Sequence, residues 1–226
     1  MTAMTQKAYK GMGMEGSIAR WYEKTTSKDI RDFQELARRI AELVPTGGKI
    51  LEVAPGPGFL AVELARTGRF SVTGVDISRT FVEIARQKAE ATGVSVEFLQ
   101  GNAAKLPLPR NSFDFLVCRA AFKNFSEPVK AIAEMHRVLK PGGKALIIDL
   151  RRDVPRSEVN SYVDNLGVGA ISRWMTKLTF RFMLIKRAYT SDEFHRMAAQ
   201  TPFGKCDLRS APLGFEVWLE KSQFAD

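Results

Sequence analysis

Cysteine and histidine are both scarce in this chain, which has two of each among its 226 residues. Two cysteines, Cys118 and Cys206, are too few for the disulfide framework of a small secreted protein. Two histidines leave few ligands for a histidine-rich metal site, and no cluster of Asp, His and Cys has metal-ligand spacing, so we expect no bound metal. We therefore expect a fold that is held together by its own hydrophobic core.

Long hydrophobic runs are also absent. The longest apolar stretches contain only a handful of residues, far fewer than the roughly 20 that a membrane-spanning helix needs. The N-terminus, MTAMTQKAYKGMGMEG, lacks the apolar core of a signal peptide. The sequence on its own therefore predicts a cytoplasmic protein.

Acidic residues are outnumbered, 25 against 34 lysines and arginines, which gives a net charge of +9. Such an excess can attract an anionic partner such as a nucleic acid or a membrane surface. The basic residues are scattered and form no run, which favours a generally basic soluble enzyme. Hydrophobic residues at 45% and charged residues at 26% are ordinary values for a globular domain.

Segments of strand type and helix type alternate along most of the chain. Short apolar runs predict five strands, at 49–54, 71–76, 94–100, 113–119 and 144–150. Helical spacing predicts a helix before the first strand and further helices between strands, at 29–44, 59–68, 79–93 and 127–139. Thr25, Thr26 and Ser27 offer N-caps for the first of these helices. Strands that alternate with helices form βαβ units and a parallel sheet.

The pattern changes after the fifth strand. Residues 151–189 form a long, basic insertion without a regular pattern. In the helix predicted next, Thr190 and Glu193 fit a capping box. Two alternating segments then predict an antiparallel hairpin, at 205–210 and 214–221.

The strongest local motif is ILEVAPGPGFLA at 50–61, in which Gly56, Gly58 and Ala61 fit the pattern G-x-G-x-x-A between a strand and a helix. Glycine lets the backbone approach a ligand closely, and the helix N-terminus adds free N–H donors. Asp76 ends the second strand, where a carboxylate can accept two hydrogen bonds from a ribose. A tight structural turn is the alternative interpretation of this loop.

Glu52 favours a cationic ligand over a dinucleotide. It lies inside the first strand, before the glycines, where an acidic side chain costs free energy unless it has a partner. A cationic cofactor or an ordered-water network would supply that partner, whereas the pyrophosphate of a dinucleotide would be repelled. The long helical leader also differs from dinucleotide-binding domains, which often begin close to their first strand.

Five segments occur in an order that is typical of one family. They are ILEVAPGPG, VTGVDIS, GNAAKLPLP, FDFLVCRAAFKNF and HRVLKPGGKALI. Together they resemble the class I S-adenosylmethionine-dependent methyltransferases of the small-molecule, type 11 kind. The resemblance covers residues 30–150 and, in outline, the C-terminal hairpin. It implies S-adenosyl-L-methionine as the cofactor and methyl transfer as the reaction.

The resemblance also implies cofactor-binding residues at the ends of the first four strands. Glu52, Gly56 and Gly58 would surround the methionine part of the cofactor, and Asp76 would bind the ribose hydroxyls. Asn102 stands where the family usually has aspartate, and its side-chain carbonyl can still accept a hydrogen bond from the adenine amino group. The full expected set is Glu52, Ala54, Gly56, Gly58, Asp76, Ile77, Asn102, Ala103 and Arg119.

The sequence does not identify a catalytic residue. Family members often carry two histidines after strand four, but this chain has Phe122-Lys123-Asn124-Phe125 there, which excludes a histidine base at that place. Lys123 is either a substrate contact or a solvated lysine at a turn. Tyr9, Tyr22 and Tyr189 lie in segments where this fold usually builds its lid, although Tyr22 could simply anchor the leader helix. The candidates are Tyr22, Lys123 and Tyr189.

Four other polar residues have plainer interpretations. His136 and His195 are predicted to be packing or surface residues on helices. Cys118 has apolar neighbours in strand four and is predicted to be a buried, inert thiol. Asp149, near the end of strand five, either faces the active site or is a structural hydrogen-bond acceptor.

We expect one methyltransferase domain over residues 1–226. Its parts are an N-terminal cap at 1–29, a cofactor-binding core at 30–150, a substrate lid at 151–189 and a C-terminal helix and hairpin at 190–226. The expected fold class is α/β: a Rossmann-like, seven-stranded, mostly parallel sheet with a C-terminal antiparallel hairpin, a helical N-terminal leader and a helical lid insertion after strand five.

The insertion carries eight basic and three acidic residues. Helical spacing predicts one shared helix face for Trp174, Leu178, Phe182, Ile185 and Tyr189. We interpret this helix as a lid over the substrate pocket, with a packing helix as one alternative. The other alternative is a basic amphipathic helix on an anionic membrane, which would give access to a lipid or quinone acceptor.

Methyl transfer from a sulfonium is an in-line displacement whose leaving group is a neutral thioether. The protein mainly has to align the nucleophile and exclude water. Our first hypothesis is transfer to a small, apolar or aromatic molecule. The alternatives are an RNA methyltransferase that uses the basic surface, and a protein that binds the cofactor for other chemistry, such as cyclisation or decarboxylation. The acceptor atom and the oligomeric state are left open.

Overall fold

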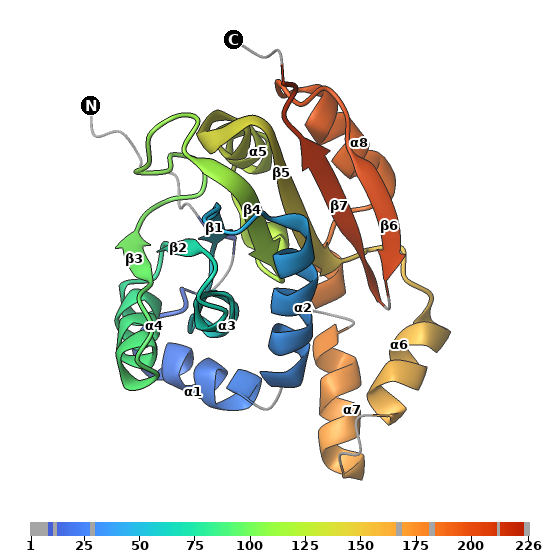
Figure 1. The fold of residues 1–226 in the computed structure, drawn as a ribbon. Coiled ribbons are helices and arrows are strands. Elements are labelled where there is room, and N and C mark those ends of the chain that lie inside the picture. The colour runs from blue at the N-terminus through green and yellow to red at the C-terminus, as the bar shows by residue number, and fades with distance from the viewer. Residues whose placement is uncertain are drawn as a thin grey trace, which may run out of the picture.

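The computed structural model describes residues 9–10, 13–27, 30–165, 169–180, 184–211 and 213–223. At its centre lies a seven-stranded sheet in the order β3-β2-β1-β4-β5-β7-β6 (Figure 1). The first five strands run parallel, and β7 pairs antiparallel with both β5 and β6. The strands are β1 Lys49–Val53, β2 Ser71–Asp76, β3 Glu97–Gln100, β4 Phe113–Arg119, β5 Leu139–Leu150, β6 Asp207–Ala211 and β7 Gly214–Glu220.

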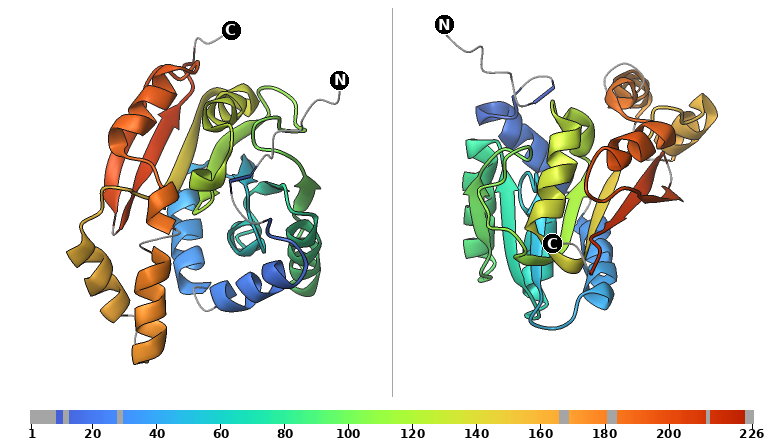
Figure 2. Two further views of the ribbon diagram at one scale, coloured as in Figure 1. Left: turned by 180° about the vertical axis from the view of Figure 1, so that it is seen from behind. Right: turned by 90° about the horizontal axis from the view of Figure 1, so that it is seen from above.

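Helices cover both faces of this sheet (Figure 2). The α-helices are α1 Gly16–Thr26, α2 Ile30–Leu43, α3 Phe59–Arg66, α4 Arg79–Ala91, α5 Pro128–Val138, α6 Arg156–Asp164, α7 Ala170–Thr179 and α8 Ser191–Ala199. Short 3-10 helices are η2 Phe122–Asn124 and η4 Ile185–Arg187. Among the residues described, no helix has both the length and the apolar character needed to cross a membrane.

Neighbouring residues of one strand belong to different cores, because side chains alternate across a sheet. In β4, Phe115 and Val117 pack with residues of α2, α3 and α4. Leu116 and Cys118 pack on the other face, with residues of α5 and α8. Burial on both faces explains why the central strands are nearly continuous apolar runs. The predicted fold class is confirmed, as is the prediction that Cys118 is a buried thiol.

Several predicted boundaries are wrong, including the start of the third strand, which is Glu97 rather than 94. Thr25 and Thr26 do not cap the second helix but are the last residues of α1. The Thr25 hydroxyl donates to the carbonyl oxygens of Trp21 (3.0 Å) and Tyr22 (2.9 Å), which is the back-bonding of a threonine inside a helix. The fifth strand begins at Leu139 rather than at 144, because Leu139 pairs with Phe113, and Gly142 and Gly143 form backbone hydrogen bonds with Lys221.

The C-terminal elements agree with the sequence. The Thr190 side chain accepts a hydrogen bond from the N–H of Glu193 (3.3 Å), and the Glu193 carboxylate accepts one from the N–H of Thr190 (2.8 Å). These two bonds form the predicted capping box of α8. The predicted hairpin is β6 and β7, and Pro212 of its turn lies outside the described residues.

The insertion after β5 contains two helices, α6 and α7, that project beyond the carboxyl ends of the parallel strands (Figure 1). They are attached by a small core of their own, formed by Val154, Val159, Val163 and Leu213. The single helix face that was predicted here does not form, because α7 ends at Thr179 and Ile185 begins a separate 3-10 helix. Phe182, which was predicted on that face, lies outside the described residues.

Candidate functional site

The loop after β1 brings left-handed residues to the carboxyl end of the sheet. Ala54, Gly56 and Gly58 have φ angles of 58°, 55° and 77°. A Cβ on Gly58 would lie 2.7 Å from the Cβ of Ala85 in α4. A Cβ on Gly56 would meet no described atom closer than the Tyr22 ring, at 4.0 Å. Gly58 therefore allows α4 to pack closely, whereas Gly56 borders space that a ligand can fill.

We expect these two glycines to respond differently to alanine. Gly56→Ala should cost about 1–2 kcal/mol of unfolding free energy, because it strains only the left-handed backbone. Gly58→Ala should cost about 1–3 kcal/mol more, because its Cβ also overlaps Ala85. Urea unfolding of both variants measures the difference. If both variants lose the same unfolding free energy, α4 must shift to make room for the added methyl group.

Asp76 ends β2 and links the glycine loop to the next turn. Its Oδ2 accepts a hydrogen bond from the N–H of Gly56 (2.9 Å), and its Oδ1 accepts one from the N–H of Ser78 (2.9 Å). Burial raises the pKa of this carboxyl, and the N–H groups of Ser78 and Gly56 oppose that rise. Each oxygen has a further lone pair, so Asp76 can still accept hydrogen bonds from a ligand at this edge.

Glu52 is buried in β1 with one oxygen unsatisfied. The residue is 3% exposed, and Oε2 has no hydrogen-bond partner in the described part of the chain. Burial raises the pKa of Glu52 to about 8, although the N–H of Ala61 and the positive charge of Arg119 lower it. A buried polar atom without a partner costs free energy, so Oε2 fits a ligand that brings a donor or a positive charge.

Arg119 ends β4 next to the glycine loop. Its guanidinium carbon lies 4.3 Å from the centre of the Phe33 ring, and its Nη2 lies 3.9 Å from Oδ2 of Asp32. Both partners belong to α2, which therefore directs the arginine. Arg119 brings positive charge close to Glu52 at the same edge of the sheet.

The loop after β3 lies against the other side of Asp76. A Cβ on Gly101 would lie 2.7 Å from Cδ of Pro107, so this turn also requires glycine. The side-chain oxygen of Asn102 accepts a hydrogen bond from the N–H of Ala104 (2.9 Å), so the carbonyl that was expected to bind a ligand is shared with the turn. Ile77 keeps 39% of its surface exposed beside this loop, as a flat apolar ligand would require.

Lys123 and Asp149 form a buried ion pair where β4 and β5 end. Lys123 Nζ lies 2.8 Å from Asp149 Oδ1 and donates also to the carbonyl oxygen of Ala120 at 2.5 Å. Asp149 accepts two further bonds, from the N–H groups of Lys123 and Leu150, both at 2.8 Å. The side chains are 6% and 2% exposed. The interpretation of Lys123 as a solvated lysine is therefore wrong, because a carboxylate on the neighbouring strand draws it inside.

Three tyrosines surround this edge. The Tyr22 ring packs edge-on against Phe81 of α4, with 5.8 Å between centroids, and faces the glycine loop. The Tyr189 hydroxyl accepts a hydrogen bond from Lys10 Nζ (2.6 Å). Burial raises the pKa of Tyr9, and the negative charges of Asp76 and Asp149 act in the same direction, whereas the positive charge of Arg187 opposes them. Tyr9 therefore keeps its hydroxyl proton at neutral pH.

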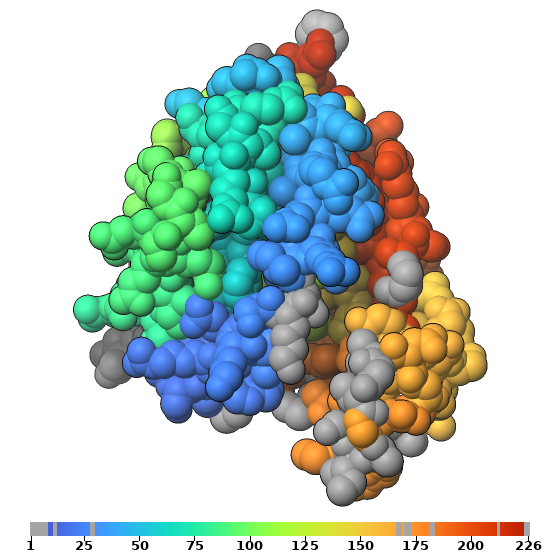
Figure 3. Space-filling view, turned by 60° about the horizontal axis from the view of Figure 1, so that its bottom comes forward, coloured from blue at the N-terminus to red at the C-terminus, as the bar shows by residue number. Residues whose placement is uncertain are grey.

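The leader contributes contacts that the sequence does not reveal. The Glu15 carboxylate accepts hydrogen bonds from the N–H groups of Arg79 and Thr80, both at 3.0 Å, and so caps α4. The Ser78 hydroxyl donates to the carbonyl oxygen of Met14 (2.6 Å). These residues lie about one-quarter of the chain apart, and no local pattern pairs them. In Figure 3, which brings this end forward, α1 flanks the edge on one side and α6 and α7 flank it on the other.

The histidines and cysteines take no part in this edge. His136 is buried, with its ring edge-on to Phe203, and His195 Nδ1 lies 3.5 Å from the sulfur of Cys206. His136 is therefore a packing residue and His195 an exposed residue of α8, and both outcomes lie within the prediction. In the ranges that the structure describes, no group of three or more His, Cys, Asp or Glu side chains could hold a metal ion.

Comparison with known proteins identifies the family. A family model described as a methyltransferase domain matches residues 51–147. The demethylmenaquinone methyltransferase of Chlorobaculum parvum is 32% identical over 178 residues, which cover 75% of this chain and 70% of that protein. The chain belongs to the S-adenosylmethionine-dependent methyltransferase family. The predicted family is thus confirmed, and S-adenosyl-L-methionine is the methyl donor of this methyltransferase family.

Other matches are shorter or show the fold alone. The demethylmenaquinone methyltransferase of Deinococcus radiodurans is 39% identical over 102 residues, which are 45% of this chain and 42% of that protein. The chain thus matches less than half the length of that relative. The structure of a candidate S-adenosyl-L-methionine-dependent methyltransferase of Methanococcus maripaludis superposes with a TM-score of 0.74, at 18% sequence identity. The match covers 97% of this chain and 97% of that chain. The structure of the [4+2]-cyclase SpnF superposes with a TM-score of 0.55 and is 21% identical in sequence. The match covers 84% of this chain and 80% of the SpnF chain.

Proposed function

We propose that this methyltransferase transfers the methyl group of S-adenosyl-L-methionine to a small aromatic acceptor of the quinone type. The observation that carries the proposal is the unpartnered, buried oxygen of Glu52 beside the open glycine loop. A cationic amino-acid group fits that oxygen, whereas a pyrophosphate does not. The acceptor class is suggested by relatives named demethylmenaquinone methyltransferases.

The chain offers a place for each part of the cofactor. Glu52 would pair with the ammonium of the methionine part, and Asp76 would accept hydrogen bonds from the ribose hydroxyls. Gly56 would let the backbone lie close to the ligand. Ile77 would pack on the adenine, with Asn102 and the N–H of Ala103 at its polar edge. Ala54 and Arg119 would border this site as well.

When bound, the cofactor supplies an electrophilic methyl group on a sulfonium, with a neutral thioether as leaving group. The protein therefore needs no general acid, and its contribution is alignment and the exclusion of water. Tyr9 and Met14 of the leader and Tyr22 of α1 lie across the loops that follow β1, β2 and β4. They would keep water away from the reacting atoms.

The acceptor would lie beyond the ends of β4 and β5. Lys123 and Asp149 form a buried ion pair at that position, and Tyr9, Tyr22 and Tyr189 lie around it. A phenol or enol acceptor must lose a proton as it is methylated, and Asp149 could take that proton through the Lys123 ammonium. Lys123, Tyr22 and Tyr189 thus stay candidates for contact with the acceptor.

Calorimetry with S-adenosylhomocysteine tests the cofactor site. Asp76→Asn should weaken binding about tenfold, because one charge-assisted hydrogen bond is lost. Asp114→Asn is the matched control, since Asp114 also accepts backbone and lysine hydrogen bonds but lies at the opposite end of β4. No binding by the folded wild-type protein would contradict the proposal. Mass spectrometry of products then separates methyl transfer, which adds a methyl group, from cyclisation, which adds none.

A further inference from the structure

Helix α7 has three large apolar side chains on the outside. Trp174, Met175 and Leu178 are 64%, 58% and 41% exposed, and with Thr179 they form one face of the helix. The opposite face, which is partly buried, carries Arg173, Thr176, Lys177 and Phe180. A helix on the surface of a globular protein normally has the reverse arrangement, with its apolar stripe inward.

The inward face of α7 is held by specific contacts. Lys177 Nζ lies 2.8 and 2.9 Å from the two carboxylate oxygens of Asp164 on α6, and Arg173 Nε lies 3.7 Å from the same carboxylate. The Phe180 ring packs against Tyr162, with 5.9 Å between centroids. These contacts fix the rotation of α7 about its axis. The apolar face is therefore turned outward by the fold itself.

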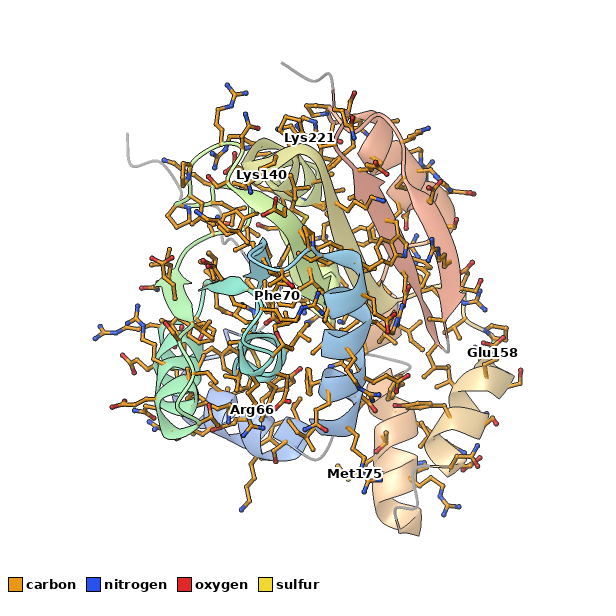
Figure 4. All side chains as sticks on the ribbon, viewed as in Figure 1. Arg66, Phe70, Lys140, Glu158, Met175 and Lys221 are labelled. Carbon is orange, nitrogen blue, oxygen red and sulfur yellow. The ribbon has the colours of Figure 1, made fainter. Side chains whose placement is uncertain are left out.

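Most of the exposed large hydrophobic residues in the described part of the chain gather at one end of the molecule, and Leu43 is the exception. Besides those of α7, Trp21 on α1 is 65% exposed and Tyr162 on α6 is 43% exposed. In Figures 1 and 2, α1, α6 and α7 all lie at the end where the parallel strands finish. Figure 4 labels Met175 and Glu158 at this end, far from Lys140 and Lys221 at the other. Patches of this kind mark interaction sites.

The charge around this patch indicates the kind of partner. Residues 151–189 carry eight basic and three acidic residues, which is five of the nine net positive charges of the chain. No acidic residue occurs in the sequence from 165 to 189. Tryptophan and leucine on one face, with arginine and lysine on the other, are the composition of helices that lie in the interface of an anionic bilayer.

We propose that the outer face of α7, together with Trp21, docks onto an anionic phospholipid bilayer. Docking would place the carboxyl edge of the sheet, where Lys123 and Asp149 lie, close to the membrane surface. An acceptor with a hydrocarbon tail could then reach the site without leaving the bilayer completely. This inference goes beyond the proposed reaction, because docking does not depend on which atom is methylated.

Sedimentation with lipid vesicles tests the docking face. Wild-type protein should bind vesicles of equal parts phosphatidylcholine and phosphatidylglycerol, and added salt should weaken this binding. The double variant Met175→Ser/Leu178→Ser should partition about tenfold less, because two apolar side chains no longer enter the interface. Leu43→Ser is the matched control, since Leu43 is 52% exposed at the end of α2. It should bind like the wild type.

Three outcomes would overturn the proposal. The first is a wild-type protein that does not bind the anionic vesicles, or binds phosphatidylcholine vesicles equally well. The second is equal loss in the control and the double variant. The third is a dimer in lipid-free solution that Met175→Ser/Leu178→Ser dissociates, which would assign the face to a second copy of the chain. Calorimetry with S-adenosylhomocysteine on the same variants reports separately on the proposed function, because α7 makes no part of the cofactor site.

Discussion

Lys123→Met will destabilise the protein by about 3–5 kcal/mol, the largest effect that we expect from any single substitution. The Asp149 side chain is 2% exposed and would be left buried without its cation. Methionine has nearly the length of lysine and fills the same space, so the cost is mainly electrostatic rather than a loss of packing. Equilibrium unfolding in urea at neutral pH measures this free energy.

The double variant Lys123→Met/Asp149→Asn is the control for this prediction. An asparagine side chain removes the unpaired charge but keeps an oxygen for the backbone N–H at position 123, which lies 2.8 Å from Asp149 Oδ2. Most of the lost free energy should therefore return. A double variant that is no more stable than Lys123→Met would refute the ion pair as the cause. If the double variant binds S-adenosylhomocysteine normally but turns over more slowly, the pair also acts on the acceptor.

The core of the fold could be predicted because its signals are local. Each parallel strand is an apolar run between turn residues, and β4 was placed at 113–119, the bounds that it has. The glycine loop and Asp76 follow from the same arrangement, because the carboxyl ends of neighbouring parallel strands meet at one edge. The hydrogen bond between Gly56 and Asp76 is the direct consequence.

The rest of the candidate site depends on pairs that are distant in the sequence. The sequence favours a solvated Lys123, because a turn after a strand is normally exposed. No residue close to Lys123 in the sequence indicates that Asp149 is its partner. Glu15 caps α4 although it lies 64 residues before Arg79 in the sequence. No sequence pattern around an acidic residue in the leader indicates which helix it caps. A clue was available for the ion pair: an Asp near the end of one strand and a Lys after its parallel neighbour must lie at the same edge.

The orientation of α7 was left open by the sequence for another reason. Helical spacing shows that apolar residues share a face, but it cannot show which way that face points. The direction is set by Asp164, which holds Arg173 and Lys177 on the inner side. The amphipathic pattern therefore predicted a helix correctly for Trp174 and Leu178 but not for Ile185 and Tyr189, and it left the partner of the helix undetermined.

Glu52→Gln will change stability and cofactor affinity in opposite directions. Burial raises the pKa of Glu52 from its ordinary 4.5 to about 8. Because the pKa is higher in the folded protein than in the unfolded chain, the protonated carboxyl contributes its full stabilisation of the folded state below about pH 4.5. This contribution is lost as the pH rises toward 8. Glutamine does not ionise, so at pH 7 the variant should be more stable than the wild type by on the order of 3 kcal/mol. The difference should shrink toward pH 5, and urea unfolding across this range measures it.

The same change should weaken S-adenosyl-L-methionine binding about tenfold to a hundredfold, because an ion pair with the ammonium is lost. At pH 7 the wild-type carboxyl is mostly protonated and must ionise to pair with the cation, so binding should release a proton and strengthen up to about pH 8. Calorimetry in buffers of different protonation enthalpy detects that proton. Glu97→Gln, at an exposed position on β3 two strands away from β1, should leave both properties unchanged. If Glu52→Gln instead destabilises the free protein, the carboxyl must already have a partner inside the fold, and its place in the cofactor site would have to be given up.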